Sequence, residues 1–276
     1  MVTTESGRKP FRSLFTTQQL VSGPWAEPMD IAEAKQQSRR GSDITTEDAV
    51  LRRYITTARE QVERDTMRAL LWQSRSLSLD EWPDRIDIYA CPVRSVAITY
   101  LDQSGTEQTV PTSVYRVRLD LEPATITLKY GQVWPDALLE SGAITVTFTA
   151  GYAVPFTASA STDTLTFTEY EPTDGESFRL TNSGGYLPGG LQESVPYFVV
   201  NASGSTCKLS RTLNGSAVDL TSDGTGINLL GVVPQSAMQA MRMLVAISFA
   251  AREGDVPANC YDAIANSLRA IKYTFG

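Results

Sequence analysis

Apolar side chains recur at helical spacing near the start of the chain, between residues 45 and 70. The positions that share one helical face there are Leu51, Tyr54, Ile55, Ala58 and Val62. Spacings of three and four residues place side chains on the same side of an α-helix. We expect Thr45 to be the N-cap of this helix, with Asp48 at the reciprocal capping position. A shorter helix is expected over residues 29–38, opened by Pro28.

Helical spacing returns near the end of the chain, after Val233. Pro234 suits the first turn of a helix, and the face that follows contains Ala237, Met241, Leu244, Val245 and Ser248. A last helix is expected over residues 258–273. Its aliphatic stripe must pack either on the protein's own core or on a partner.

Between residues 72 and 155 the apolar period changes to two. The alternating positions include Leu77, Leu79, Ile86, Ile88, Val96, Ile98 and Tyr100. This alternation is typical of strands with one buried face. The segment from Asp102 to Gly105 has the composition of a turn between two such strands. The pattern predicts a sheet of five or six short strands after the two helices.

Residues 156–232 differ in composition from the rest of the chain. More than a quarter of them are Ser or Thr, and they contain ten of the 19 glycines and no helical period. The segments TDTLTFT, SFRLT, YFVVNA, TCKLS and SAVDLT are expected strands, separated by dipeptides that close tight turns. This part of the chain is therefore expected to be a compact β module.

The β module is flanked by two similar phrases, FTAGYAVP before it and LLGVVPQSAMQA after it. We interpret both as parts of one hinge between a strand and a helix, which an insertion has separated. A surface insertion costs little because the entropy of loop closure grows only logarithmically with length.

The predicted fold class is α+β: a helical core with a small antiparallel sheet, plus an inserted all-β domain. The core would comprise residues 29–155 and 233–276, and the inserted domain residues 156–232. Residues 1–28 show no clear period and are expected to form an N-terminal arm.

Composition excludes several function classes. The net charge of -7 argues against a protein that neutralises nucleic-acid phosphates. The chain has no histidine, which removes the commonest general base and metal ligand. Cys91, Cys207 and Cys260 are too far apart for a metal knuckle. No apolar run is long enough for a membrane helix and no secretion signal is visible, so we expect synthesis in the cytoplasm and no membrane partner.

Motifs that resemble catalytic ones do not carry chemistry here. Ser205 and Lys208 match a serine acyltransferase pattern, but they lie in a predicted strand instead of at a helix start. The cluster GGYLPGG lacks the following Gly-Lys of a phosphate loop. We therefore expect no enzyme activity, no catalytic residue, no metal ligand and no cofactor.

Arginine is unusually frequent among the basic residues, with 19 of 24. Several arginines lie on the first long helix, interleaved with acidic residues. That spacing suits ion pairs along a helix or contacts at a protein interface. The candidates for contacts between subunits are Arg52, Arg53, Arg59 and Arg64.

The order of motifs resembles the head-to-tail connector family of tailed bacteriophages, also called adaptor or head-completion proteins. The motifs are DIAEAKQQSR, TTEDAVLRRYITTAREQVERDTMRALL, CPVRSVAITYLDQSGTEQTV, VTFTAGY and VPQSAMQAMRMLVAISFAARE. They cover most of residues 28–155 and 232–273. The intervening module resembles a small β module that recurs in phage virion proteins.

The resemblance implies a structural protein of the virion neck, made in the host cytoplasm. Such a protein forms a dodecameric ring of identical copies beneath the portal protein, extends the channel through which genomic DNA passes, and receives the next neck or tail-completion protein. By position, the C-terminal segment would reach the portal. Its candidate contacts are Tyr261, Ile264, Leu268, Arg269, Lys272, Tyr273 and Phe275.

Two alternatives stay open at this stage. The β module could bind or process a sugar, which predicts exposed aromatic and acidic side chains around Tyr170, Tyr186 and Tyr197. The chain could also be a tail-completion protein further down the neck.

Overall fold

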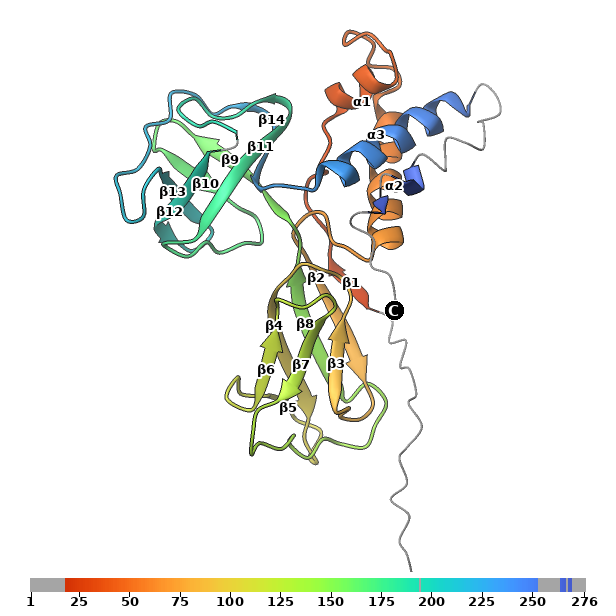
Figure 1. Cartoon of the computed structure of the whole chain (residues 1–276), viewed down its shortest axis with the longest axis vertical. Coiled ribbons are helices and arrows are strands. Elements are labelled where there is room, and N and C mark those ends of the chain that lie inside the picture. Colours follow the sequence, from red (N-terminus) through yellow and green to blue (C-terminus); the bar gives the residue numbers. More distant parts are fainter. Residues whose placement is uncertain (1–17, 194, 253–263, 267, 270–276) are drawn as a thin grey trace, which may run out of the picture.

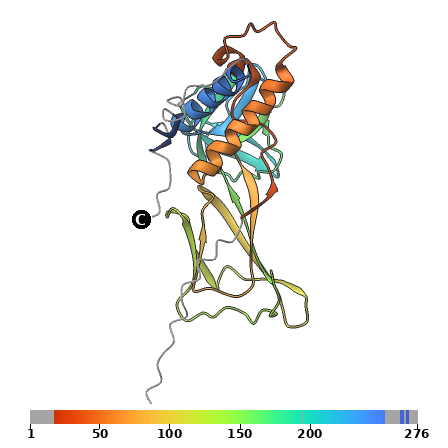
Figure 2. The same ribbon diagram turned by 90° about the vertical axis from the view of Figure 1, so that its right-hand side faces the viewer.

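The computed structural model describes residues 18–193, 195–252, 264–266, 268 and 269, which form three bodies with separate hydrophobic cores. They are a helix cluster, a two-layer β-sandwich and a closed β-barrel. Figure 1 shows the barrel beside the helix cluster, with the elongated sandwich extending away from both. In Figure 2, viewed from the helix side, α2 and α3 lie in front of the barrel.

The helix cluster joins the two ends of the described chain. Its members are α1 (Ile31–Gln37), α2 (Asp48–Thr66) and α3 (Gln235–Ala250). The predicted apolar faces are confirmed, because Leu51, Ile55 and Val62 of α2 are buried with Met241 and Leu244 of α3. Residues 235–250 thus pack against a helix that is almost 170 residues earlier in the sequence.

The helix starts differ from the prediction for α2. Thr45 is not the N-cap: α2 begins at Asp48, and Glu47 precedes it without a capping side chain. The carbonyl of Thr45 accepts a hydrogen bond from the Asp48 amide at 3.2 Å, so this segment is a turn before the helix. The Asp48 carboxylate instead pairs with Lys35 at 2.8 Å and ties α2 to α1.

The sandwich contains two antiparallel sheets packed face to face around one core. The five-stranded sheet has the order β1-β2-β8-β4-β5, with β1 (Gln19–Ser22), β2 (Gln73–Leu79), β8 (Ile144–Ala150), β4 (Val93–Leu101) and β5 (Glu107–Thr109). The second sheet has the order β3-β7-β6, with β3 (Arg85–Ile88), β7 (Ala124–Leu128) and β6 (Tyr115–Arg118). The turn at Asp102 is confirmed: its carboxylate accepts hydrogen bonds from the amides of Ser104 and Thr106.

One strand of the sandwich lies in the expected N-terminal arm. β1 pairs with β2, with Gln19 opposite Ser76. Four residues are too few to show a period of two, so the sequence carried no signal for this strand.

The barrel closes with the order β10-β13-β12-β11-β14-β9. Its strands are β9 (Ala153–Ser159), β10 (Thr164–Thr166), β11 (Ser177–Tyr186), β12 (Pro196–Ser203), β13 (Thr206–Ser210) and β14 (Thr225–Gly231). The all-β character of this region is confirmed. The expected strand SAVDLT is wrong, since only an isolated bridge forms there between Ala217 and Ser210. β14, in the segment TGINLLG, was missed because it lacks alternation.

The phrase FTAGYAVP is not part of a strand-to-helix hinge. It ends β8 of the sandwich and begins β9 of the barrel, with Gly151 between them at φ 148°. A Cβ atom at Gly151 would lie 2.5 Å from the backbone carbon of Leu71, so only glycine fits this crossing. The chain leaves the barrel beside its entry, because Gly231 pairs with Ala153.

The prediction of a helical core with a small sheet is wrong, because the protein is mostly β. The three named helices contain 7, 19 and 16 residues, and the described residues form fourteen strands. The strands of residues 73–150 do not cover the helices as one small sheet. They close on themselves as a sandwich with its own core, which includes Ile88, Ile98, Ile126 and Phe148.

Candidate assembly site

No site for chemistry emerges from the described part of the chain. Among these residues, no group of three His, Cys, Asp or Glu side chains could hold a metal ion. A cavity of about 10 Å³, lined by Met67, Arg68, Cys91 and Glu122, is about the size of one water molecule. None of the described helices is long and apolar enough to cross a membrane. Surfaces for assembly are therefore the features to compare with the predicted interface residues.

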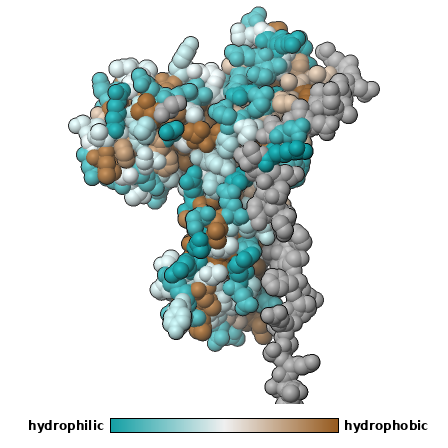
Figure 3. All heavy atoms as spheres, viewed as in Figure 1, coloured by the Kyte–Doolittle hydropathy of each residue, from teal (hydrophilic) through white to brown (hydrophobic). Residues whose placement is uncertain are grey.

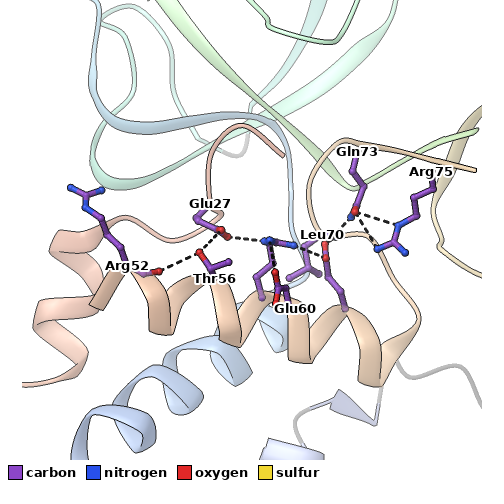
Figure 4. A network of polar contacts seen from close by, with 9 residues as sticks. Glu27, Arg52, Thr56, Glu60, Leu70, Gln73 and Arg75 are labelled. Atoms are coloured by element: carbon purple, nitrogen blue, oxygen red, sulfur yellow. Dashed lines mark hydrogen bonds and ion pairs between the residues drawn. The ribbon is translucent and has the colours of Figure 1, made fainter. Parts of the chain in front are cut away.

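Of the four predicted arginines, Arg59 lies inside the chain. Its side chain is 6% exposed. Its Nε donates to Glu27 and its Nη1 to Glu63, each at 2.8 Å (Figure 4). Arg59 thus holds the segment before α1 against α2 and is bonded within its own chain.

Glu63 connects α2 to the start of β2. One carboxylate oxygen accepts a hydrogen bond from the Leu70 amide at 2.8 Å and another from Gln73 Nε2 at 2.9 Å, while the other oxygen pairs with Arg59. Burial raises the pKa of Glu63 above its ordinary value, and Arg59 acts in the opposite direction. The network shown in Figure 4 fixes the angle between the helix cluster and the sandwich.

The other three arginines of α2 are exposed. Arg64 pairs with Asp65 at 3.8 Å, and its side chain is 74% exposed. Arg52 and Arg53 have no ion-pair partner among the described residues. Figure 4 shows the Arg52 side chain pointing away from the Arg59 network. These three side chains are available to a partner, and their role in subunit contacts stays a prediction.

The predicted portal contacts fall largely outside the described residues. Tyr261, Lys272, Tyr273 and Phe275 lie there. Of the remainder, Ile264 and Leu268 are each 4% exposed and belong to the core of the helix cluster, whereas Arg269 is exposed. Portal binding by this segment stays a prediction.

A set of exposed apolar residues that the sequence analysis did not select lies where α2 meets the sandwich. Leu119, Met67 and Leu121 are 46%, 39% and 39% exposed. Met67 ends α2 in the left-handed conformation, at φ 54°. The segment LDLEP, in which leucines alternate with acids after β6, was the available signal. It was missed because apolar residues in a turn have no period that marks them as exposed.

The aromatic cluster that a sugar site would need is not present among the described residues of the barrel. Tyr197 and Tyr170 lie in the barrel core, and only Tyr186 is exposed. Burial raises the pKa of the Tyr170 phenol, whose hydroxyl donates to Glu176 at 2.5 Å. These tyrosines stabilise the barrel, so the observation that the sugar hypothesis required is missing.

The barrel is attached to the other bodies at two places besides its covalent ends. At the sandwich, Trp72 Nε1 donates to the Glu169 carbonyl at 3.1 Å and its ring stacks edge-on against Tyr170 at 4.9 Å. At the helices, the Ser183 hydroxyl donates to Glu33 at 2.5 Å and accepts from the Asp30 amide at 2.8 Å. Contacts on two sides hold the barrel in one orientation.

Comparison with known proteins gives a fold and no family. No protein-family model matches the chain, and no curated protein does. A chain in the neck of the native gene transfer agent particle, computed with C12 symmetry, aligns over 94% of this chain and 97% of its own, with 17% identity and a TM-score of 0.52. Because so much is covered, most of the barrel lies within the shared fold.

Two further structures align over less of the chain. One is a chain in the neck of the empty gene transfer agent particle, computed with C6 symmetry, and the other comes from the virion of the native particle. Each covers 49% of this chain at 26% identity, with TM-scores of 0.42 and 0.40 and with 71% and 72% of their own lengths matched. These partial alignments do not extend the likeness beyond the fold.

Proposed function

We propose that this protein is a structural component of the neck of a phage or phage-like particle. In this role, identical copies form a ring between the portal and the tail, extend the DNA channel and receive the next neck protein. The observation that carries the proposal is the fold, which is shared over 94% of the chain with a protein of a gene transfer agent neck. Twelve copies are the ring size that we propose, following the symmetry of that neck.

The surface of the protein supports an assembly role. Large apolar side chains are exposed at several separate places, among them Leu121, Tyr130, Leu139 and Leu213. Exposed apolar patches rimmed by polar groups are typical of interaction sites. A subunit of a ring needs at least two different surfaces of this kind, one for each neighbour.

We propose that the C-terminal segment contacts the portal. Ile264 and Leu268 anchor this segment in the helix cluster, and Arg269 is exposed beside them. Tyr261, Lys272, Tyr273 and Phe275 would then complete the portal contact.

The test is the mass of the assembled protein, measured by mass photometry for the full chain alone and mixed with the portal of the same particle. The expected result is a ring of identical copies that binds the portal, visible as a ring on the portal in cryo-electron microscopy. A chain that stays monomeric in both samples contradicts the proposal. A ring that binds only the tail side would favour the tail-completion alternative.

A further inference from the structure

The exposed residues at the end of α2 form one surface, which we call the α2 face: Arg53, Arg64, Met67, Leu119 and Leu121. Arg53 and Arg64 are eleven residues apart, about three helical turns, and therefore lie on the same side of α2. Arg68, next to Met67, donates to Glu122, next to Leu121, at 2.7 Å. This ion pair holds the apolar side chains of the helix and of the β6–β7 turn close together.

The charge of the α2 face is positive and largely uncompensated. Arg53 has no ion-pair partner among the described residues, and Arg64 has only its neighbour Asp65 at 3.8 Å. Arg68 is already paired with Glu122. The face thus presents three apolar side chains beside two arginines, a composition typical of protein interfaces.

The barrel carries a surface of the opposite charge, which we call the barrel face: Glu171, Asp174 and Leu213. The loop from 167 to 176 contains four carboxylates, of which Glu169 and Glu176 bond to groups within the chain. Glu171 is exposed and has no partner among the described residues. Leu213 is 58% exposed and lies over this loop, since a Cβ atom on Gly175 would be 3.5 Å from its Cδ1.

The two faces lie on different sides of the molecule. The segment between β13 and β14, which contains Leu213, lies on the side of the barrel away from the helices (Figure 1). In Figure 3 the barrel surface shows hydrophobic patches among hydrophilic atoms. The α2 face lies instead where the helix cluster meets the sandwich, so a single chain cannot bring its own two faces together.

We propose that the barrel face of one copy packs on the α2 face of the next copy. This inference rests on the proposed ring and names the surfaces that join its subunits. The carboxylates of Glu171 and Asp174 meet Arg53 and Arg64, while Leu213 packs against Met67, Leu119 and Leu121. A contact between two different surfaces is heterologous, and repeating it by rotation closes a ring.

The test exchanges charges on the two faces. Variant one carries Arg53→Glu and Arg64→Glu, and variant two carries Glu171→Lys and Asp174→Lys. Each variant places like charges across every contact, so the fraction of protein in rings should fall at least about tenfold in mass photometry. A 1:1 mixture should restore rings, because each face of one variant then meets the opposite charge on the other.

Controls separate folding from assembly. Circular dichroism checks that each variant is folded. Because Asp174 accepts a hydrogen bond from the Ala202 amide, Glu171→Lys alone is measured as well. Arg116→Glu, on the exposed side of β6, is the matched control and should leave ring formation unchanged.

The outcomes distinguish this inference from the proposed function. If the wild-type chain forms no ring alone or on the portal, the proposed function fails together with the inference. If rings form and both variants assemble like the wild type, or if the mixture does not recover, the named contact is overturned while the ring stands. Variants that form rings but lose only portal binding would assign the α2 face to the portal and also overturn the inference.

Discussion

The barrel and the helix cluster are stabilised by opposite arrangements of the chain. All six barrel strands come from residues 153–231, and the first and last of them pair at Ala153 and Gly231. The helix cluster takes α1 and α2 from one end of the described chain and α3 from the other. The barrel can therefore complete its core from contiguous sequence, whereas the helix cluster forms only when the barrel brings its ends together.

The comparison also extends to the kinds of interaction. The barrel encloses apolar and aromatic side chains such as Phe156, Leu165 and Tyr197. The helix cluster adds a buried polar network at Arg59 and Glu63, which also ties it to the sandwich. A self-contained core tolerates rearrangement of its surroundings, while a polar network between bodies depends on their relative position.

We propose on these grounds that the barrel is an insertion, and removing it is the largest test. Replacing residues 153–231 with a short glycine linker should leave the sandwich and its core intact. The helix cluster should be weakened, since Ala153 and Leu229 belong to its core and Ser183 bonds to Glu33. The measurement is urea unfolding followed by circular dichroism and tryptophan fluorescence. Loss of every cooperative transition would contradict the insertion.

A single substitution in the barrel core should affect the barrel alone. Tyr197→Ala removes a side chain that is fully buried, and large-to-small changes of this kind cost about 3–5 kcal/mol. Burial raises the pKa of Cys207 to about 12, so its thiol reacts only when the barrel opens. We expect faster labelling of Cys207 in a Cys260→Ser background, with Cys91 unchanged.

The control for that experiment is Tyr186→Ala, which truncates an exposed tyrosine and should leave the labelling rate unchanged. Equal acceleration of Cys91 and Cys207 by Tyr197→Ala would show that the barrel does not unfold independently.

The corresponding substitution in the helix cluster is Glu63→Ala. It leaves Arg59 with Glu27 and strips the Leu70 amide and Gln73 of their acceptor. Leaving buried polar groups unpaired costs about 1–3 kcal/mol each, so we expect a loss of about 2–4 kcal/mol in the free energy of unfolding. Differential scanning calorimetry measures it. Glu60→Gln, at an exposed position of the same helix, should have little effect.

The smallest expected effect lies in the sandwich, at the exposed turn of Asp102. Hydrogen bonds from Ser104, first from its hydroxyl, and from the Thr106 amide lower the pKa of Asp102 to about 2. A lowered pKa means that the stabilisation is present above the unfolded value, about 3.9, and is lost as the pH falls toward 2.

Asp102→Asn should therefore lower the urea midpoint slightly at pH 6 and leave it unchanged near pH 2. A difference between variant and wild type that persists at pH 2 would contradict this assignment.

Local pattern was sufficient where a feature depends on residues close in sequence. The buried faces of α2 and α3 follow from Leu51, Ile55, Met241 and Leu244, because helix geometry relates positions three and four apart. The turn at Asp102 also depends on local hydrogen bonds alone. The β character of residues 156–232 followed from composition and turn dipeptides. The assembly role came from a resemblance in motif order, not from the chemistry of any site.

Only the tertiary structure decided which strands pair and which charged side chains are buried. Arg59 and Arg64 are indistinguishable by spacing on α2, yet Arg59 faces Glu27 from a distant segment and Arg64 faces solvent. Similarly, Met67, Leu119 and Leu121 form one surface because the Arg68–Glu122 ion pair joins segments about 50 residues apart. The sequence by itself determined the local elements. Their pairing and exposure were set by contacts between distant residues, which no local period encodes.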